Sequence, residues 1–324
     1  MNTVLATILL DLGYVLIFPG FLFCFLIGML LCGIERKIVA RMQKRVGPPV
    51  LQPFYDFFKL CGKETIVPTA ANKAVYMIAP LFGLASLVTI QLFIPIFSFS
   101  AFGNMADIIV ILYLLLLPAL AEIYGAAASG SPYAGIGLSR EMVNIISFEL
   151  PLVLILLAVG KYVGNYMDGG LTFSLTAIRD FQLINGSLIG KLSLIPAAIA
   201  MLLVIPGEIG SHPFDTAEAE TEICEGMLAE YSGAPLAVFK LSHSIKMLTM
   251  TSLFVALFLG GLGVGNIVFD ALIMIALCIV IIIVDVALIN AVTARLKTEQ
   301  LFKYYWTVVS GLAAISFVLA WFGL

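Results

Sequence analysis

Long apolar runs dominate the chain and recur eight times, with most charged residues between them. A helix that crosses a membrane needs about 20 consecutive apolar residues. Because backbone polar groups find no water in lipid, each run is expected to be helical. The pattern predicts an all-α polytopic membrane protein, with residues 1–324 forming a single integral membrane domain. The predicted spans cover residues 4–33, 75–97, 107–128, 143–163, 187–206, 236–260, 266–291 and 304–323.

Positive charges fall in every second loop, which predicts the orientation. Most lysines and arginines lie between spans 1 and 2, 3 and 4, and 7 and 8, whereas the opposite loops carry only Lys161, Arg179 and Lys191. The positive-inside rule puts the lysine- and arginine-rich loops in the cytoplasm and both termini outside. The first run lacks a basic start and a small-residue cleavage site, so it is expected to remain as a span.

Composition narrows the class of protein further. The chain is 61% hydrophobic and 11% charged, which excludes an ordinary soluble domain. Its 17 Lys and Arg against 20 Asp and Glu leave no basic field for nucleic acid. The five cysteines form no C-x-x-C pair, and no nucleotide-binding or hydrolytic motif occurs. We expect either a self-sufficient transporter or a membrane subunit that couples a partner's chemistry to ions. No inverted repeat is visible to support the transporter.

An amphipathic segment lies between spans 1 and 2. In residues 52–61 the side chains of Phe54, Phe57 and Phe58 share one helical face, and Asp56 and Lys59 take the other. This pattern predicts a helix in the plane of the membrane interface. It is interpreted either as a simple anchor or as the wall of a site shared with a cytoplasmic partner.

The loop between spans 5 and 6, called loop 5–6, is strongly acidic. Asp215 and Glu218 resemble a capping box that opens a helix, and Ser232-Gly233 would close it. Glu218, Glu222 and Glu225 would then share one face, and some protons would be retained near neutral pH because like charges disfavour joint ionisation. The alternative is a solvated acidic face. The seven acids of this stretch are Glu208, Asp215, Glu218, Glu220, Glu222, Glu225 and Glu230.

Ionisable groups also occur inside the apolar runs, where burial costs several kcal/mol and function is the default interpretation. The acids are Glu122, Glu141, Glu149, Glu208 and Asp285, and the possible intramembrane bases are Lys240, His243 and Lys246. These acids and bases should face one another, either as structural ion pairs or as a chain of protonatable groups leading to loop 5–6. Asp107 and Asp270 are expected to be boundary residues. No metal site is predicted, since neither histidine has a second ligand nearby.

Several stretches together resemble the proximal membrane subunit of complex I, which is subunit 1 or H of NADH:quinone oxidoreductase. They are Glu35-Arg36-Lys37, Arg41-Met42-Gln43, Arg45, Gly47-Pro48, Leu51-Gln52-Pro53, Asp56, Lys59, Lys63-Glu64, Arg140, Ser147-Phe148-Glu149, Glu208, Pro213-Phe214-Asp215, Glu218, Glu220, Glu222 and Glu230-Tyr231-Ser232-Gly233. The resemblance covers nearly the whole chain and implies the same eight spans, with amphipathic and acidic loop helices in the cytoplasm.

The resemblance implies that the chain anchors a peripheral redox arm and that its acids open a proton path. By position it gives acidic roles to Glu35, Glu149, Glu208, Asp215, Glu218, Glu220, Glu222 and Glu230, and loop-ordering roles to Arg36, Arg41, Arg45 and Arg140. With the buried groups added, the predicted proton path comprises Glu122, Glu141, Glu149, Glu208, Asp215, Glu218, Glu220, Glu222, Glu225, Glu230 and Asp285. Glu122 is included only because burying a charge in a membrane span is costly, and the resemblance gives it no role. The predicted redox-arm interface comprises Glu35, Arg36, Arg41, Arg45, Asp56, Lys59, Arg140 and His212.

Three departures point to one branch of this family. Only Pro49-Val50 stand where quinone-reducing members have a longer insertion, Ser211 replaces a usual arginine, and Glu141 follows Arg140. A shorter loop and a missing arginine would shrink a quinone cavity. Together with Ser129-Gly130-Ser131-Pro132, they resemble the related subunit of energy-converting group 4 nickel–iron hydrogenases. The alternatives are a quinone- or methanophenazine-linked complex, formate hydrogenlyase or a sulfur reductase.

The hydrogenase resemblance implies that this chain binds no cofactor and has no catalytic residue of its own. Iron–sulfur clusters and a nickel–iron centre are expected in a small and a large partner subunit, and antiporter-like subunits are expected in the membrane of a prokaryotic cell. The coupled ion, H⁺ or Na⁺, stays open. The predicted helix from Glu218 to Glu230 is the candidate element that links redox state to protonation.

Overall fold

The computed structural model describes residues 10–167 and 170–323, apart from the side chains of Asn104, Glu220 and Thr221. This part of the chain is nearly all helical, and no extended strand occurs in it. It contains eight helices long and apolar enough to cross a membrane, which confirms the all-α polytopic prediction. They are Leu10–Met42 (including α2, Phe21–Met42), Lys73–Phe93 (α4), Ile108–Ser129 (α5), Pro132–Met167 (α6), Leu192–Ile209 (including α8, Ile195–Ile209), Gly233–Phe258 (α10), Ile267–Val292 and Thr298–Trp321.

The last two spanning helices each contain a π-helical turn. Ile267–Val292 consists of α11 (Ile267–Ile281), the π turn η6 (Ile282–Ala287) and α12 (Leu288–Val292). Thr298–Trp321 consists of α13 (Thr298–Tyr304), the π turn η7 (Tyr305–Val309) and α14 (Ser310–Trp321). Such single π turns occur frequently at functional sites.

Two predicted boundaries differ from the observed helices by the largest margins. The fourth span was predicted over residues 143–163, but α6 begins at Pro132. Gly130 with φ +71° ends α5, and a proline such as Pro132 suits the first turn of the helix that follows. The first helix continues to Met42, beyond the charged residues that ended the apolar run. Residues 4–9 of the first predicted span lie outside the described residues.

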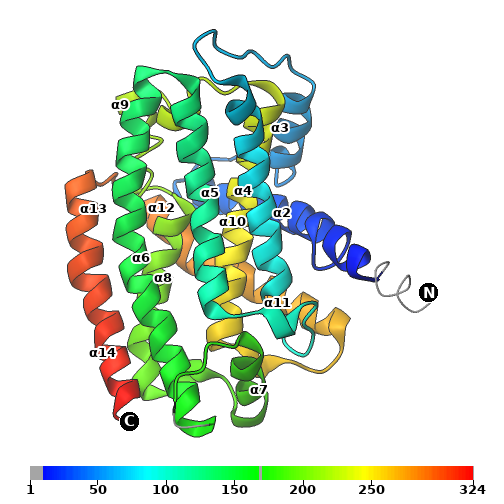
Figure 1. Ribbon diagram of the computed structural model, residues 1–324, viewed down its shortest axis with the longest axis vertical. Helices are drawn as coiled ribbons and strands as arrows, with labels where there is room; N and C mark the ends of the chain where they lie inside the picture. Colours follow the sequence, from blue (N-terminus) through cyan, green and yellow to red (C-terminus); the bar gives the residue numbers. More distant parts are fainter. Residues whose placement is uncertain (1–9, 168–169, 324) are drawn as a thin grey trace.

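Most of the spanning helices run side by side along the long axis of the molecule, whereas α2 and α11 cross it obliquely (Figure 1). The amphipathic helix α3 (Gln52–Cys61) and the short helix α9 (Glu220–Ile223) lie at one end, called here the α3 end. The helix α7 (Leu175–Asn185) lies at the opposite end, the α7 end. The structure thus has a helix over residues 52–61, and its place in a membrane interface stays a prediction.

The helix α10 is the core of the bundle, with α2, α3, α4, α8 and α11 packed around it. Nearly all its side chains from Leu241 onward are buried, although they include many Ser and Thr residues. Gly28 of α2 approaches its backbone closely, since a Cβ there would lie 3.0 Å from the carbonyl oxygen of Ser244. Small residues permit such close packing between membrane helices. The packing places Lys246 among buried side chains.

Loop 5–6 does not contain the predicted helix from Glu218 to Glu230. It has one helical turn, α9, and one 3₁₀ turn, η4 (Gly226–Leu228), separated by left-handed backbone at Cys224 and Glu225. Tertiary contacts override the local pattern: a Cβ at Gly226 would lie 2.1 Å from the carbonyl oxygen of Ala217, so the chain is folded back on itself. The predicted shared face of Glu218, Glu222 and Glu225 is therefore also wrong.

Candidate functional site

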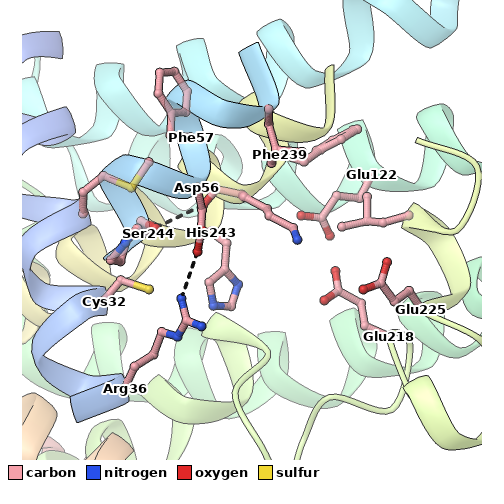
Figure 2. A pocket seen from close by; sticks show the side chains of 15 residues that line it. Cys32, Arg36, Asp56, Phe57, Glu122, Glu218, Glu225, Phe239, His243 and Ser244 are labelled. Carbon is pink, nitrogen blue, oxygen red and sulfur yellow. Dashed lines mark hydrogen bonds and ion pairs between the residues drawn. The ribbon is translucent and has the colours of Figure 1, made fainter. Parts of the chain in front are cut away.

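A cavity of about 420 Å³, called here the main cavity, opens at the α3 end between α2, α3, α5, α10 and loop 5–6 (Figure 2). Its wall combines apolar side chains with an unusual number of ionisable ones. The lining residues are Met29, Cys32, Arg36, Pro53, Asp56, Phe57, Leu60, Glu122, Glu218, Glu225, Leu228, Phe239, Lys240, His243 and Ser244.

Opposite charges face each other across the main cavity. Figure 2 shows Glu122, Glu218 and Glu225 on one side, with Arg36 and His243 opposite them. Arg36 Nη1 lies 3.4 Å from Asp56 Oδ2 on α3. The apolar face of α3 is held by Phe25 of α2, whose ring centroid lies 5.2 Å from that of Phe57. The amphipathic helix is therefore a wall of a polar cavity.

Two smaller cavities continue from the main cavity into the bundle. The inner cavity, of about 40 Å³, shares Glu122, Glu218 and His243 with the main cavity and is also lined by Glu208 and Lys246. The deep cavity, of about 20 Å³, lies between α5, α6 and α8 and is lined by both Glu208 and Glu149. Shared residues thus connect the three spaces in series. Their carboxyl groups, called here the acid chain, belong to Glu122, Glu141, Glu149, Glu208, Asp215, Glu218 and Glu225.

A largely buried ion pair lies at the centre of the acid chain. Lys246 Nζ is 3.2 Å from Glu208 Oε1, and both side chains are almost 90% removed from solvent. The expectation that acids and bases face each other holds for this pair. Lys240, also predicted as an intramembrane base, is instead exposed and lines the main cavity, while His243 lines both the main and the inner cavity.

Glu218 titrates near neutral pH. Burial raises its pKa to about 7, and the neighbouring carboxylates of Glu141, Glu225 and Asp215 contribute in the same direction, against the opposing charge of Lys240. The group is therefore about half protonated at physiological pH. This agrees with the expectation that loop 5–6 retains protons near neutrality.

Two arginines fix the first half of loop 5–6. Arg295 makes a bidentate contact with Asp215, with Nε–Oδ1 at 2.9 Å and Nη2–Oδ2 at 2.5 Å. Arg140 Nη1 lies 2.6 Å from Glu222 and donates to the backbone oxygen of Thr216 at 3.1 Å. Arginine forks suit such fixed recognition of carboxylates. These contacts orient Glu222 toward Arg140, and Glu222 does not line the main cavity.

Two tyrosines fix the second half of loop 5–6. The rings of Tyr76 and Tyr231 stack with centroids 4.1 Å apart. Tyr76 donates its hydroxyl hydrogen to the backbone oxygen of Glu230 at 2.7 Å, and Tyr231 donates to the backbone oxygen of Tyr76 at 3.2 Å. The segment between Asp215 and Tyr231 is therefore anchored at both ends.

Some residues of the predicted proton path lie outside the linked cavities. Glu222 and Glu230 are exposed, and Asp285 is buried but lines none of the three cavities. The side chain of Glu220 lies outside the described residues. The structure therefore assembles seven of the predicted acids into one series of cavities and separates these others from it.

The residues predicted for a redox-arm interface lie at or near the α3 end. Arg41, Arg45 and Lys59 are exposed. Glu35 is buried and accepts a hydrogen bond from Asn290 at 2.8 Å. His212 is half-buried, and its Nδ1 has no hydrogen-bond partner among the described residues.

Four residues that shape this region were not predicted as site residues. Asn144 donates to Glu141 at 3.0 Å and accepts from Thr216 at 3.0 Å, and its spacing of three residues from Glu141 on a helix is a usable signal. Arg295, Asn290 and Tyr305 reach their partners from distant segments, which no local pattern indicates.

Comparison with known proteins identifies the family. A family model described as NADH dehydrogenase matches residues 15–321. The chain belongs to the NADH dehydrogenase subunit 1/H family. Among the described residues of this family member, no group of three or more His, Cys, Asp or Glu side chains is placed to hold a metal ion.

Relatives of this NADH dehydrogenase family member come from several kinds of complex. Hydrogenase-4 component C of Escherichia coli K12 is 34% identical over 250 residues, which is 76% of each chain. The H-type subunit of the NADH-quinone oxidoreductase of Thermomicrobium roseum is 34% identical over 313 residues, 87% of each chain. A chain in the structure of an archaeal membrane-bound sulfane sulfur reductase superposes with a TM-score of 0.83 at 29% identity, covering 99% of this chain and all of that one. The protein is thus a membrane subunit of a complex I-like or hydrogenase-type complex.

Proposed function

We propose that this chain is the membrane subunit of an energy-converting nickel–iron hydrogenase complex. It anchors a peripheral redox arm at the α3 end and couples ferredoxin-linked hydrogen or proton chemistry to the translocation of H⁺ or Na⁺. The iron–sulfur clusters and the nickel–iron centre belong to a small and a large partner subunit. Antiporter-like membrane subunits are the expected partners on the other side of the acid chain.

The observation that carries this proposal is the series of cavities that connects the α3 end to Glu149. Glu218 and Glu225 line the outer space, Glu208 lines both inner spaces, and Glu149 lines the deepest one. A change of charge at a docked redox centre acts on such carboxyl groups through space and shifts their protonation. Because the groups follow one another through shared cavities, a proton taken up at one end can be passed to the next.

The chemistry of the main cavity supports the hydrogenase branch. Sites for apolar ligands are lined mainly by hydrophobic and aromatic side chains with few polar groups. The main cavity instead carries Arg36, Lys240 and His243 together with the carboxylates of Asp56, Glu122, Glu218 and Glu225. Such a lining suits water and protons better than a quinone.

The segment from Asp215 to Tyr231 takes over the linking role that the predicted helix was expected to play. Both ends of this segment are anchored. Between them, Cys224 and Glu225 adopt positive φ angles of 51° and 64°. Non-glycine residues in this conformation carry backbone strain, which is often found at switch regions. A change in the protonation of Glu218 would therefore act on a segment whose backbone is strained at two neighbouring residues.

The proposed orientation has the α3 end in the cytoplasm of a prokaryotic cell. The loop that follows the first spanning helix is rich in basic residues and contains α3, which lies at this end. The positive-inside rule then orients the chain, and the peripheral arm docks where the main cavity opens.

A sulfur reductase or a quinone-linked complex I relative is the second candidate. The superposition on the sulfane sulfur reductase chain covers nearly the whole molecule, and the NADH-quinone oxidoreductase relative is as similar as the hydrogenase component. In these alternatives the acid chain has the same coupling role, and only the chemistry of the docked partner differs.

The experiment is purification of the intact complex from its native membranes through an affinity tag on this chain. The proposal predicts nickel in the purified complex and hydrogen evolution with reduced ferredoxin, neither of which should appear in a preparation from an untagged strain. A complex that contains no nickel and reduces sulfur or quinone would reject the hydrogenase assignment and leave the membrane-coupling role in place.

A further inference from the structure

Asp285 is a buried carboxyl group without a full set of partners. Its side chain is 6% exposed, and Oδ2 has no hydrogen-bond partner among the described residues. Buried polar atoms are normally paired, so an unpaired carboxylate oxygen marks the position of a proton or of an ordered water. Asp285 also lies in the π turn η6, where the regular helix is interrupted.

A second polar cavity lies between the C-terminal part of α2, the loop that follows it and Asn290 of α12. It has a volume of about 360 Å³ and is called here the side cavity; it is lined by Glu35, Arg36, Val39, Ala40, Arg45, Gly47, Pro48 and Asn290. Glu35 is 7% exposed, and its Oε1 accepts a hydrogen bond from Asn290 Nδ2 at 2.8 Å. The helix α2, which carries Glu35, packs against both η6 and α12. Asn290 and Asp285 thus stand in one spanning helix, in two consecutive segments that both pack against α2.

The second π turn, η7, begins at Tyr305 in the last spanning helix. The Tyr305 ring is fully buried, and its hydroxyl donates to the backbone oxygen of Leu203 at 2.9 Å. The turn η7, which carries Tyr305, packs against α8. The helix α8, which carries Glu208, also packs against η6.

We infer that Asp285 holds a proton on a second branch, which joins the side cavity at Glu35 to Glu208 of the acid chain. The inference rests on the proposed coupling function and adds a separate entrance to it. In each step one O–H bond breaks and another forms: the proton leaves the carboxyl of Glu35, reaches Asp285 through ordered water, and passes to the carboxylate of Glu208. Asn290 is a positioning residue that fixes the Glu35 carboxyl, and the Tyr305 hydroxyl supports the last step.

The branch has a clear consequence for Glu208. Glu208 is paired with Lys246 on the side of the inner cavity, so it can receive a proton from that cavity or from Asp285. Loss of one branch should therefore lower coupled transport without abolishing it. Loss of Glu149, which lies beyond the junction, should abolish transport.

The experiment compares Asp285→Asn, Glu35→Gln and Tyr305→Phe in the purified complex reconstituted into vesicles. Glu299→Gln is the matched control, because Glu299 is an exposed acid in the last spanning helix, paired with Lys303 at 2.9 Å. Two readouts are used: ions moved per turnover, and the infrared C=O band of protonated carboxylic acids, which shifts in deuterated water.

Asp285→Asn should remove one protonated-carboxyl band and reduce transport roughly 2- to 30-fold, the range expected for residues along a coupling network. Tyr305→Phe should move that band. Glu35→Gln should reduce transport by a similar factor. Because this variant interrupts the branch at its entrance, it tests the inference even if the Asp285→Asn complex does not assemble. Glu299→Gln should change neither readout.

Two outcomes overturn the inference in distinguishable ways. If Glu149→Gln abolishes transport but Asp285→Asn and Glu35→Gln leave transport and the infrared band unchanged, the second branch does not exist and the acid chain stands. If Glu149→Gln itself leaves transport intact, the proposed coupling function fails and the branch fails with it.

Discussion

Asp270 and Asp285 are two buried aspartates in the same membrane helix, and their surroundings differ completely. Asp270 is fully buried and accepts hydrogen bonds from the hydroxyl and backbone nitrogen of Ser98 and from the backbone nitrogen of Val264. Asp285 is almost as buried, but its Oδ2 has no partner in the described part of the chain. A carboxylate with a full set of hydrogen bonds stabilises the loops that donate them, whereas a carboxylate with an unbonded oxygen can accept a proton there. Burial alone does not distinguish these roles.

The same contrast divides the acids of loop 5–6. Asp215 and Glu222 are held by arginines, while Glu218 faces the main cavity opposite His243. Paired acids fix the shape of the loop, and cavity-facing acids can change protonation. Substitutions of the two kinds should therefore differ in their effects on stability, on its pH dependence and on transport.

The largest effect on stability is expected for Lys246→Met. It leaves the carboxylate of Glu208 buried without its partner, which typically costs about 3 to 5 kcal/mol. Thermal unfolding of the detergent-solubilised complex measures the loss. The double variant Lys246→Met/Glu208→Gln removes the unpaired charge and should recover part of it; a double variant no more stable than the single one would contradict this account.

Asp270→Asn should cost more stability than Asp285→Asn. Hydrogen bonds to a charged group are worth about 1.5 to 3 kcal/mol, and only Asp270 has a network of them among the described residues. The free energy of unfolding of the two variants, measured side by side, gives the comparison. Greater destabilisation by Asp285→Asn would show that Asp285 has partners and a structural role.

Glu218→Gln should change how stability depends on pH. The folded-state pKa of Glu218 is about 7, above the ordinary value of 4.5, so the folded protein binds more protons at this site than the unfolded chain between those values. The free energy of unfolding therefore falls as pH rises from about 4.5 to about 7. Melting temperatures of the wild type should decline relative to Glu218→Gln across this window. A constant difference between the two would mean that Glu218 does not titrate there.

The smallest effect is expected for Glu222→Gln. The Glu222 side chain is about half exposed, and exposed ion pairs contribute about 0.2 to 1 kcal/mol. Stability and coupled transport should both remain close to wild type, in contrast to substitutions in the acid chain. A large loss of transport would place Glu222 among the acting groups.

The sequence predicted the spans and the amphipathic helix because both depend on local periodicity. It did not predict the path of loop 5–6, where Arg140 and Arg295, from distant segments, capture Glu222 and Asp215. The helix predicted from the spacing of the acids does not form, because these contacts and the tight approach of Gly226 to Ala217 fix a different backbone path. The sequence also could not show that Asp270 and Asp285 differ in hydrogen bonding, because the partners of Asp270 are Ser98 and Val264, which lie in loops outside the helix.

The central claim is that the linked carboxyl groups carry the coupled ion movement. Glu149→Gln in the intact complex tests it most directly, because Glu149 lines the deepest cavity together with Glu208 and the substitution preserves side-chain size. We expect this variant to assemble normally and to keep normal hydrogen chemistry with artificial electron donors, but to show no coupled ion transport in vesicles. Transport at the wild-type rate would contradict it.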